Sequence, residues 1–378
     1  MAVTFRFARI DEYPVLSKFL NDFWAENHVY CRDKALFDWT FHANPNWGQD
    51  GYCFAMAENG GELVGILGGI PFGFNHKGQR MSGVWIANYV VRPDHRKGTL
   101  ALQLLSQFRR PEFKAVVASG INPATITIYK VLRGEVLPLV PRHFAVMPGA
   151  VDRMKNLLAI AYPDMAAEQA ASLASAFELS ALPAPPASHG SSIPATWDAV
   201  DWKDIGSETI GAARDAAYLK WRYVDHPTFQ YRIVTVPDGS RTGLAVWRLE
   251  TIRQKLADGS RKDVDRIGRM VEFLPASRDN ADHLLGAVLA EMRGADVFAM
   301  DYYGFHGETR GWLGEIGLKL ADTHPDGEKI PSRFQPLDGK GGGILSAMFR
   351  PEGVPSVAIE PSCPWYWTKS DSDQDRPN

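Results

Sequence analysis

The chain has 378 residues, of which 45% are hydrophobic and 22% charged, and its formal net charge is −3. This balance excludes a general affinity for nucleic acid or for an anionic membrane surface. The length exceeds what one ordinary core accommodates and predicts two domains. Cys31, Cys53 and Cys363 have neither zinc spacing nor an even count, so we expect no metal site and a reducing, cytoplasmic setting.

The sequence shows neither the pattern of a signal peptide nor that of a membrane-spanning helix. The first residues, MAVTFRFARIDEY, carry charges and lack the apolar core of a signal peptide. No stretch approaches the ~20 apolar residues that a membrane-spanning helix needs. We therefore expect no membrane insertion.

The first 150 residues alternate between strand and helix patterns. Apolar alternation predicts strands over 3–10, 52–58, 63–71, 79–92, 114–119 and 144–147. Apolar faces at helical spacing, with Asp11 as a helix cap, predict helices over 11–26, 33–43, 100–108 and 122–134. This order indicates an α/β layered fold in which helices cover a mixed sheet.

A change of composition separates the two halves. Residues 151–197 contain a helix of small residues and the Pro/Ser/Ala-rich stretch LPAPPASHGSSIPA, which is typical of a linker. The second half predicts further elements at 218–223, 231–236, 243–249, 267–274, 284–292, 296–301 and 310–317. The expected division is a first domain over 1–150, a linker over 151–197 and a second domain over 198–378.

A short pattern occurs once in each half. Both Trp39 to Pro45 and Trp221 to Pro227 read Trp, five residues, Pro, and each is followed by a predicted hairpin, a third strand and a helix. The shared order of elements indicates an internal duplication.

The stretch VWIANYVVRPDHRKGTLA, residues 84–101, reads as a buried strand, a basic turn and the start of a helix. Free backbone N–H groups at a helix start favour an anion, and a glycine lets a phosphate approach the backbone. Arg96 and Lys97 add positive charge beside Gly98. In the second half the same turn reads LPASRDNADHLL, with neither glycine nor a basic cluster, so no second phosphate site is expected.

This stretch resembles the GNAT acyltransferase superfamily, whose turn of the form Arg/Gln-x-x-Gly-x-Gly/Ala follows a strand that ends V-x-P. Pro93, Arg96 and Ala101 fall on that pattern, Gly98 stands one residue early, and His95 replaces an aromatic residue. The resemblance implies that backbone N–H groups here hold the pyrophosphate of acetyl-CoA. It assigns the cofactor to Val90, Val91, Arg96, Lys97, Gly98, Thr99, Leu100 and Ala101.

A second GNAT pattern is an Asn, a Tyr seven residues later, and a Gly that ends the helix. Asn122 and Tyr129 have this spacing, and Gly134 lies one place beyond the usual position. By resemblance, Asn122 binds the pantetheine arm and Tyr129 protonates the departing thiolate. A phenol with a pKa of ~10 can donate a proton to a thiolate of comparable basicity. The alternative for Tyr129 is a residue of the amphipathic core.

The acceptor side has weaker signals, and no residue stands out as the general base. Asp38 and His42 lie four residues apart beside Trp39, near the place where the family builds its acceptor pocket. Trp85 and Asn88 on the central strand, and Asp301 at the end of a later strand, are further candidates. For each of these, a surface or core role is the competing interpretation.

Two C-terminal features have structural interpretations. Asp371, Asp373 and Asp375 alternate but lack the Gly and distal Glu of a calcium loop, which predicts a solvated acidic tail. The alternative is that these carboxylates or Arg376 fold back to contact a sugar. PLDGKGGGI, residues 336–344, lacks the Lys-Ser/Thr of a nucleotide loop and predicts a flexible connection.

These observations predict two GNAT-like α/β domains, each a mixed sheet flanked by helices, of which the first binds acetyl-CoA and the second is degenerate. The expected activity is N-acetylation by direct attack of an amine on the thioester. The Trp-containing helices and the tail SDSDQDRPN resemble GNAT proteins linked to cell-surface polysaccharide, which implies an amino-sugar acceptor. The alternatives are an aminoacyl or longer-chain acyltransferase and a non-catalytic binding protein. Oligomeric state is not encoded in these patterns.

Overall fold

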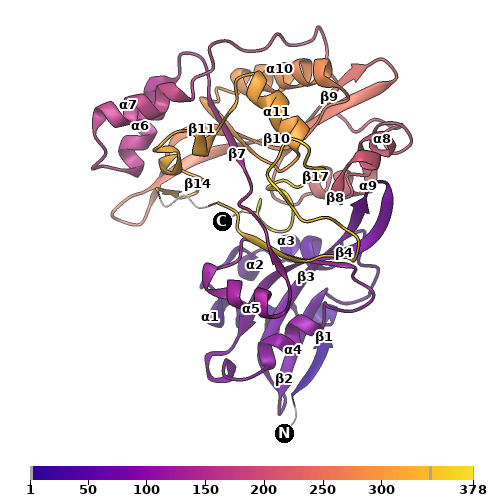
Figure 1. Cartoon of the computed structure of the whole chain (residues 1–378). Helices are drawn as coiled ribbons and strands as arrows, with labels where there is room; N and C mark the ends of the chain where they lie inside the picture. The colour runs from indigo at the N-terminus through magenta and orange to yellow at the C-terminus, as the bar shows by residue number, and fades with distance from the viewer. Residues whose placement is uncertain (1–2, 340–342, 378) are drawn as a thin grey trace.

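A computed structural model describes residues 3–339 and 343–377 of the chain. Figure 1 shows two lobes, each a sheet with helices packed against it, and the C-terminal segment runs between them. The expected mixed α/β class is confirmed. Lys340, Gly341 and Gly342 of the predicted flexible loop lie outside the described residues.

The first sheet forms the lower lobe of Figure 1, and most of its strands lie where the sequence predicts them. Its main path runs β1-β2-β3-β4-β5-β16-β6, with β8 paired to β3 and β17 paired to β8. The strands are β1 (Thr4–Phe7), β2 (Phe54–Asn59), β3 (Glu62–His76), β4 (Gln79–Val91), β5 (Ala115–Ser119), β6 (Glu135–Val136), β8 (Ile210–Ala212), β16 (Ser346–Phe349) and β17 (Trp365–Tyr366).

The helices of this lobe are short and cover both faces of the sheet. They are α1 (Tyr13–Phe23), α2 (Val29–Arg32), α3 (Lys34–Phe41), α4 (Leu100–Ser106) and α5 (Ile126–Val131), with 3-10 turns at Ile10–Glu12, Pro93–His95 and Pro123–Thr125. Asp33 caps α3 by accepting from the Leu36 N–H. Asp11 caps no helix and instead pairs with Arg9 at 3.2 Å.

The second sheet forms the upper lobe and has the order β13-β7-β12-β11-β10-β9. Its strands are β7 (Arg142–Val146), β9 (Tyr231–Asp238), β10 (Arg241–Lys255), β11 (Arg261–Leu274), β12 (Ala299–Tyr303) and β13 (Lys319–Leu320), and a separate hairpin joins β14 (Arg333–Phe334) to β15 (Leu337–Asp338).

The helices after β7 pack mainly against this second sheet or bridge the lobes. They are α6 (Val151–Ala161), α7 (Ala167–Ala176), α8 (Asp201–Glu208), α9 (Ala216–Leu219), the π-helical turn Lys220–Val224, α10 (Arg278–Gly294), α11 (Gly307–Glu315) and 3-10 turns at Ala321–Thr323 and Gly327–Lys329. Within residues 3–339 and 343–377, no helix has the length and apolarity needed to span a bilayer.

The two lobes exchange strands: β7 joins the second sheet, and β8, β16 and β17 join the first. β7, from the first half of the sequence, pairs with β12 of the second sheet, whereas β16, from the second half, pairs with β5 of the first. The expectation that 144–147 closes the first half is therefore wrong, because that strand completes the other sheet. The expected boundaries at 150 and 198 stay a prediction, but they do not coincide with membership of the two sheets.

The predicted duplication appears as a reciprocal contact between equivalent residues. The Trp39 and Trp221 rings stack with centroids 4.6 Å apart and an interplanar angle of 15°. The Trp39 indole N–H donates to the Trp221 carbonyl at 3.0 Å, and the Trp221 N–H donates to the Trp39 carbonyl at 3.2 Å. Each half thus presents the same residue to the other, as in a two-fold symmetric interface.

The C-terminal segment, residues 368–376, is not the solvated acidic tail that the sequence predicts. Asp371 and Asp375 are each 2% exposed. Asp371 lies 2.9 Å from a nitrogen of Arg214, and Asp375 lies 2.6 Å from Arg248. The carboxylates are buried because two guanidinium groups, themselves withdrawn from water, neutralise them.

Replacing Arg214 by Met should destabilise the protein by about 3–5 kcal/mol, because it leaves two buried carboxylates without their partner. Arg214 is fully buried and pairs with Glu272 at 2.7 Å as well as with Asp371. Urea unfolding measures the change. The control is Arg253→Met, whose exposed pair with Asp263 contributes less than about 1 kcal/mol. Equal losses of unfolding free energy in the two variants would show that the buried ion pairs stabilise the protein no more than the exposed pair does.

Candidate functional site: the split sheet and the cavity between the lobes

The first sheet opens where β4 and β5 part. These strands pair in parallel from Gly83–Ala115 to Ile86–Ala118, and their ladder then ends. Just beyond, the pairing of β4 with β3 shifts register, so Asn88 bulges out with φ 51°. The Asn88 side-chain oxygen is buried and has no partner within the described residues. Past the bulge, the edge of β4 that faces β5 carries backbone groups free to bind a ligand.

The turn after β4 is open and positively charged. Gly98 has φ 116°, and a Cβ placed there would meet no atom within 4 Å. Arg96 donates from Nε to the Val91 carbonyl at 2.9 Å, which leaves the rest of its guanidinium free to face outward. Lys97 and Thr99 are exposed, whereas Leu100 is buried and fixes the start of α4. The turn is therefore held at both ends and accessible in the middle.

The other charges of this turn neutralise one another. Arg92 pairs with Asp94 at 2.7 Å and with Glu62 at 3.1 Å. His95 lies 3.0 Å from Asp94 and 3.3 Å from the Asn59 amide. Positive charge available to an anion therefore resides on Arg96 and Lys97, as the sequence predicts. Ala101 accepts a hydrogen bond at its carbonyl from the Tyr89 hydroxyl, which ties the helix to the bulged strand.

Asn122 and Tyr129 lie beyond the end of β5. Asn122 accepts from the Ala124 N–H at 2.9 Å, so its oxygen caps the local turn and its amide N–H₂ group is left to donate elsewhere. Tyr129 is 4% exposed, and burial raises its pKa to about 12. Within the described part of the chain its hydroxyl has no hydrogen-bond partner. The phenol therefore keeps its proton and can donate it.

The second lobe repeats the split but fills it. The parallel pairing of β11 with β12 ends at Met270–Tyr302, and β11 bulges at the next residue. By register, Phe273 corresponds to Val91, and its N–H donates to the Tyr366 hydroxyl at 3.1 Å. Ser277 caps the following helix by accepting from the Asn280 N–H. Protein groups thus occupy the positions that remain open in the first lobe.

A cavity of about 700 Å³ lies between the lobes, against the end of β5. Gly120 and Ile121, which directly precede Asn122, form one wall. The opposite wall comes from the second sheet and the C-terminal segment, and its charged or aromatic lining residues are Arg248, Glu250, Arg269, Tyr303, Arg333, Asp338, Lys369, Asp375 and Arg376. The cavity is therefore polar and adjoins the split of the first sheet.

The charged wall is an ordered chain of ion pairs. Arg248 and Arg269 stand opposite each other on β10 and β11, and Glu250 bridges them. Asp301 lies 3.0 Å from Arg269 and 2.9 Å from Arg142. Burial would raise the pKa of Glu250 and of Asp301, but the neighbouring arginines hold both below their usual range. These carboxylates are therefore ionised and weakly basic.

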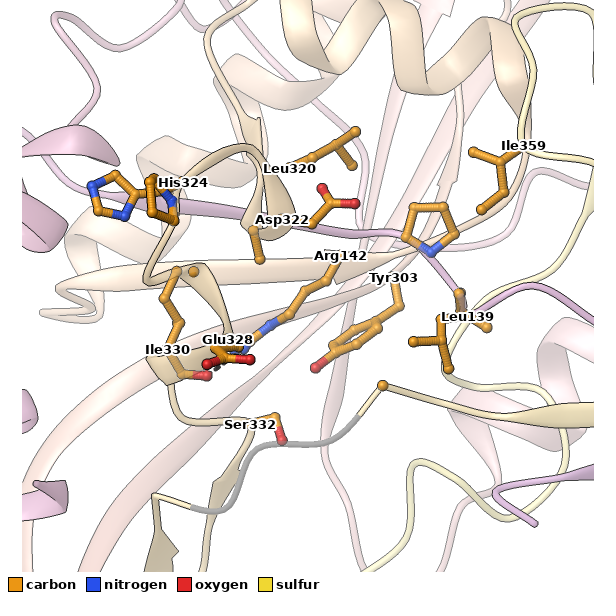
Figure 2. A pocket seen from close by; sticks show the side chains of 16 residues that line it. Leu139, Arg142, Tyr303, Leu320, Asp322, His324, Glu328, Ile330, Ser332 and Ile359 are labelled. Atoms are coloured by element: carbon orange, nitrogen blue, oxygen red, sulfur yellow. Dashed lines mark hydrogen bonds between the residues drawn. The ribbon is translucent and has the colours of Figure 1, made fainter. Parts of the chain in front are cut away.

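A second, more apolar cavity of about 420 Å³ adjoins the first, with which it shares Tyr303, Ser332 and Gly343. Figure 2 shows Arg142 and Tyr303 side by side in it, with Leu139 and Ile359 beyond the Tyr303 ring. Arg142 donates to the Ile330 carbonyl at 2.9 Å. The two cavities together give the interdomain region a charged part and an apolar part.

The predicted acceptor residues do not gather at this cavity. Asp38 accepts from the Tyr52 hydroxyl at 2.6 Å, and His42 lies 3.1 Å from the Gly51 carbonyl. Trp39 belongs to the symmetric tryptophan contact, and Trp85 stacks on Phe72 within the core with ring centroids 3.8 Å apart. Asp301 lies behind the cavity wall, paired with arginines. A substrate role for these five stays a prediction.

Sequence reasoning missed the charged wall itself. Arg248 and Glu250 alternate in the strand pattern WRLETIR, and Arg269 recurs in IGRMV. Alternating charges within otherwise buried strands indicate a polar site on one face of a sheet. Lys369 gave no such signal, because the segment that carries it has no strand or helix pattern. Asp375 and Arg376 line the cavity, in keeping with the alternative that the tail folds back, whereas contact with a sugar stays a prediction.

Comparison with known proteins finds a family similarity in the first lobe. Residues 14–120 match the family model described as "Acetyltransferase (GNAT) family". This part of the chain is therefore similar to GNAT acetyltransferase domains. The match spans β2 to β5 with the turn at Gly98, the part that carries the split and the open turn. No curated protein matches the sequence.

Solved structures extend the GNAT likeness over the whole chain. A GCN5-related N-acetyltransferase from Anabaena variabilis has a TM-score of 0.55 at 12% identity, covering 92% of this chain and 72% of its own. Saccharomyces cerevisiae N-myristoyltransferase with bound myristoyl-CoA also scores 0.55, at 13% identity, covering 96% and 88%. A probable N-acyltransferase from Enterococcus faecalis scores 0.52 at 12% identity, covering 93% and 73%. The expected fold of two GNAT-like domains is confirmed.

The resemblance assigns a pyrophosphate to this turn, and it therefore predicts that Gly98→Glu abolishes binding of acyl-CoA, because the substitution places bulk and negative charge in the open turn. Calorimetric titration measures the affinity, and we expect a loss of at least about 100-fold, or about 2.7 kcal/mol. The matched control is Gly239→Glu in the β9–β10 turn, which also has positive φ and open space around it. Retained affinity in Gly98→Glu would show that the pyrophosphate does not bind at this turn.

Proposed function

We propose that the protein is an N-acetyltransferase that uses acetyl-CoA as the acyl donor and an amino sugar as the acceptor. The observation that carries the proposal is the cavity of about 700 Å³, which meets the end of β5 beside the split of the first GNAT-like domain. A donor in the split and an acceptor in the cavity would bring thioester and amine together at one point.

The first domain supplies the donor side. In this proposal the pyrophosphate lies on the turn of Arg96 to Ala101, and the backbone N–H groups near Val90 and Val91 hold and polarise the thioester carbonyl. The free amide N–H₂ group of Asn122 donates to the pantetheine arm. The amine attacks the carbonyl directly, and the phenol of Tyr129 gives its proton to the departing thiolate.

The cavity chemistry supports an amino sugar as the acceptor. Sugars present several hydroxyls, and Arg, Glu and Asp side chains on this wall can donate to them and accept from them. A sugar acceptor fits a role in the building of cell-surface polysaccharide, and the unpaired cysteines fit a cytoplasmic setting.

The direct test is release of CoA from acetyl-CoA in the presence of amino sugars, nucleotide-linked amino sugars, amino acids and simple amines. We expect turnover with an amino sugar at a higher kcat/KM than with any other amine. A preference for amino acids would show that the proposed acceptor class is wrong. Faster turnover with long-chain acyl-CoA would show that the proposed donor is wrong. Tight binding of acetyl-CoA with no turnover on any amine would favour the non-catalytic alternative.

Tyr129→Phe should lower kcat by about 100-fold, as expected for loss of a general acid, while acetyl-CoA affinity stays unchanged. Steady-state kinetics and calorimetry separate these quantities. Tyr13→Phe is the control, because it removes a hydroxyl that donates to the Tyr30 carbonyl, away from the split sheet. Unchanged kcat in Tyr129→Phe would assign this side chain to the core, the competing interpretation.

A further inference from the structure

Lys369 occupies a distinctive place in the cavity between the lobes. It follows β17 in the C-terminal segment and lines the cavity together with Gly120 and Ile121. Its Nζ lies 4.8 Å from the centroid of the Tyr303 ring. Within residues 3–339 and 343–377, no carboxylate pairs with it and no acceptor takes its protons. Lys369 thus lines, with an amine that has no ion-pair partner among these residues, the space that an acceptor substrate would fill.

The carboxylates nearest to this lysine are engaged elsewhere. Glu250 is shared by Arg248 and Arg269, and Asp375 accepts three hydrogen bonds from Arg248 and one from the Tyr231 hydroxyl. Asp301 is shared by Arg269 and Arg142. A carboxylate held by a guanidinium gains little by taking up a proton. None of these three groups is therefore suited to be the general base.

Burial, with Arg269 beside it, favours the neutral form of Lys369. Burial, and then repulsion by Arg269, lower the pKa of Lys369 to about 7, although Asp301, Asp375 and Glu250 oppose the shift. Arg333, Asp338 and Arg376 line the same cavity. A general base works best when its pKa lies near the working pH, since enough of it is then unprotonated.

We propose that Lys369 is the general base that deprotonates the acceptor amine. The inference rests on the proposed N-acetyltransferase function and adds to it the residue that the sequence leaves unidentified. The acceptor ammonium gives one proton to the neutral Lys369 amine, which becomes an ammonium. The freed lone pair forms the C–N bond with the thioester carbonyl, and the C–S bond breaks. The thiolate leaves with its electron pair and takes the proton of Tyr129, and the amide nitrogen gives its second proton to the Tyr129 phenolate. The lysine later releases its proton to water.

The decisive experiment compares Lys369→Met and Lys369→Arg with wild type over pH 5.5–9. Met keeps a linear side chain without a base, and Arg keeps the positive charge but does not deprotonate in this range. For wild type, kcat/KM should rise tenfold per pH unit below about pH 7 and then level off. Both variants should lose about 100-fold at pH 8 and lose this acid limb. Acetyl-CoA affinity should stay unchanged, and Lys155→Met, at an exposed lysine paired with Asp152, should behave as wild type.

The outcomes separate the two proposals. Wild-type turnover together with an unchanged acid limb in Lys369→Met would overturn the role of Lys369 and leave the acetyltransferase function standing. High activity in Lys369→Arg would also overturn it, because charge alone would then suffice. If urea unfolding shows that Lys369→Met is not folded, the pH profile of Lys369→Arg tests the role of Lys369. Wild type that neither binds nor turns over acetyl-CoA would overturn the proposed function and the base together.

Discussion

The arrangement of the lobes depends on pairing two buried guanidinium groups with the C-terminal segment. Arg214 and Arg248 come from the second half of the chain, and both are almost fully withdrawn from water. An unpaired buried charge costs several kcal/mol, so these arginines require Asp371 and Asp375 beside them. The segment that satisfies them reaches on to the first lobe, where the Gln374 amide donates to the Ser119 carbonyl at 3.1 Å. The C-terminal segment therefore holds the end of β5 and the charged wall together.

The exchange of β7 and β16 fixes the lobes more firmly than a linker between independent domains would. Each sheet contains a strand that arrives from the other half of the sequence, so the lobes cannot separate without breaking ladder hydrogen bonds in both sheets. The reciprocal contact of Trp39 and Trp221 adds a stacked apolar pair at the junction. A cavity between lobes tied at several points keeps its shape, which is what orienting two substrates demands.

Local patterns predicted most of the elements, because each depends on neighbours in sequence. The strands before the Gly98 turn, the turn itself and the duplicated Trp-Pro pattern follow from periodicity, glycine and caps. The exchanged strands could not be foreseen, since 142–146 has the same alternation whichever sheet it joins. The burial of the tail was also hidden: Asp371 and Asp375 look solvated until the partners Arg214 and Arg248, more than a hundred residues away, are placed beside them.

The two lobes show how one fold can serve two roles after duplication. Both keep a parallel pair of strands that parts at a bulge, yet only the first leaves the bulge and the following turn open. In the second, Tyr366 and Ser277 satisfy the backbone groups that a donor would otherwise bind. In that lobe β10 and β11 carry Arg248, Glu250 and Arg269 as a charged wall facing the first lobe. In the proposed function, filling one donor site thus leaves a single split sheet for the acyl group, and the charged wall of its partner lobe is free to bind the acceptor.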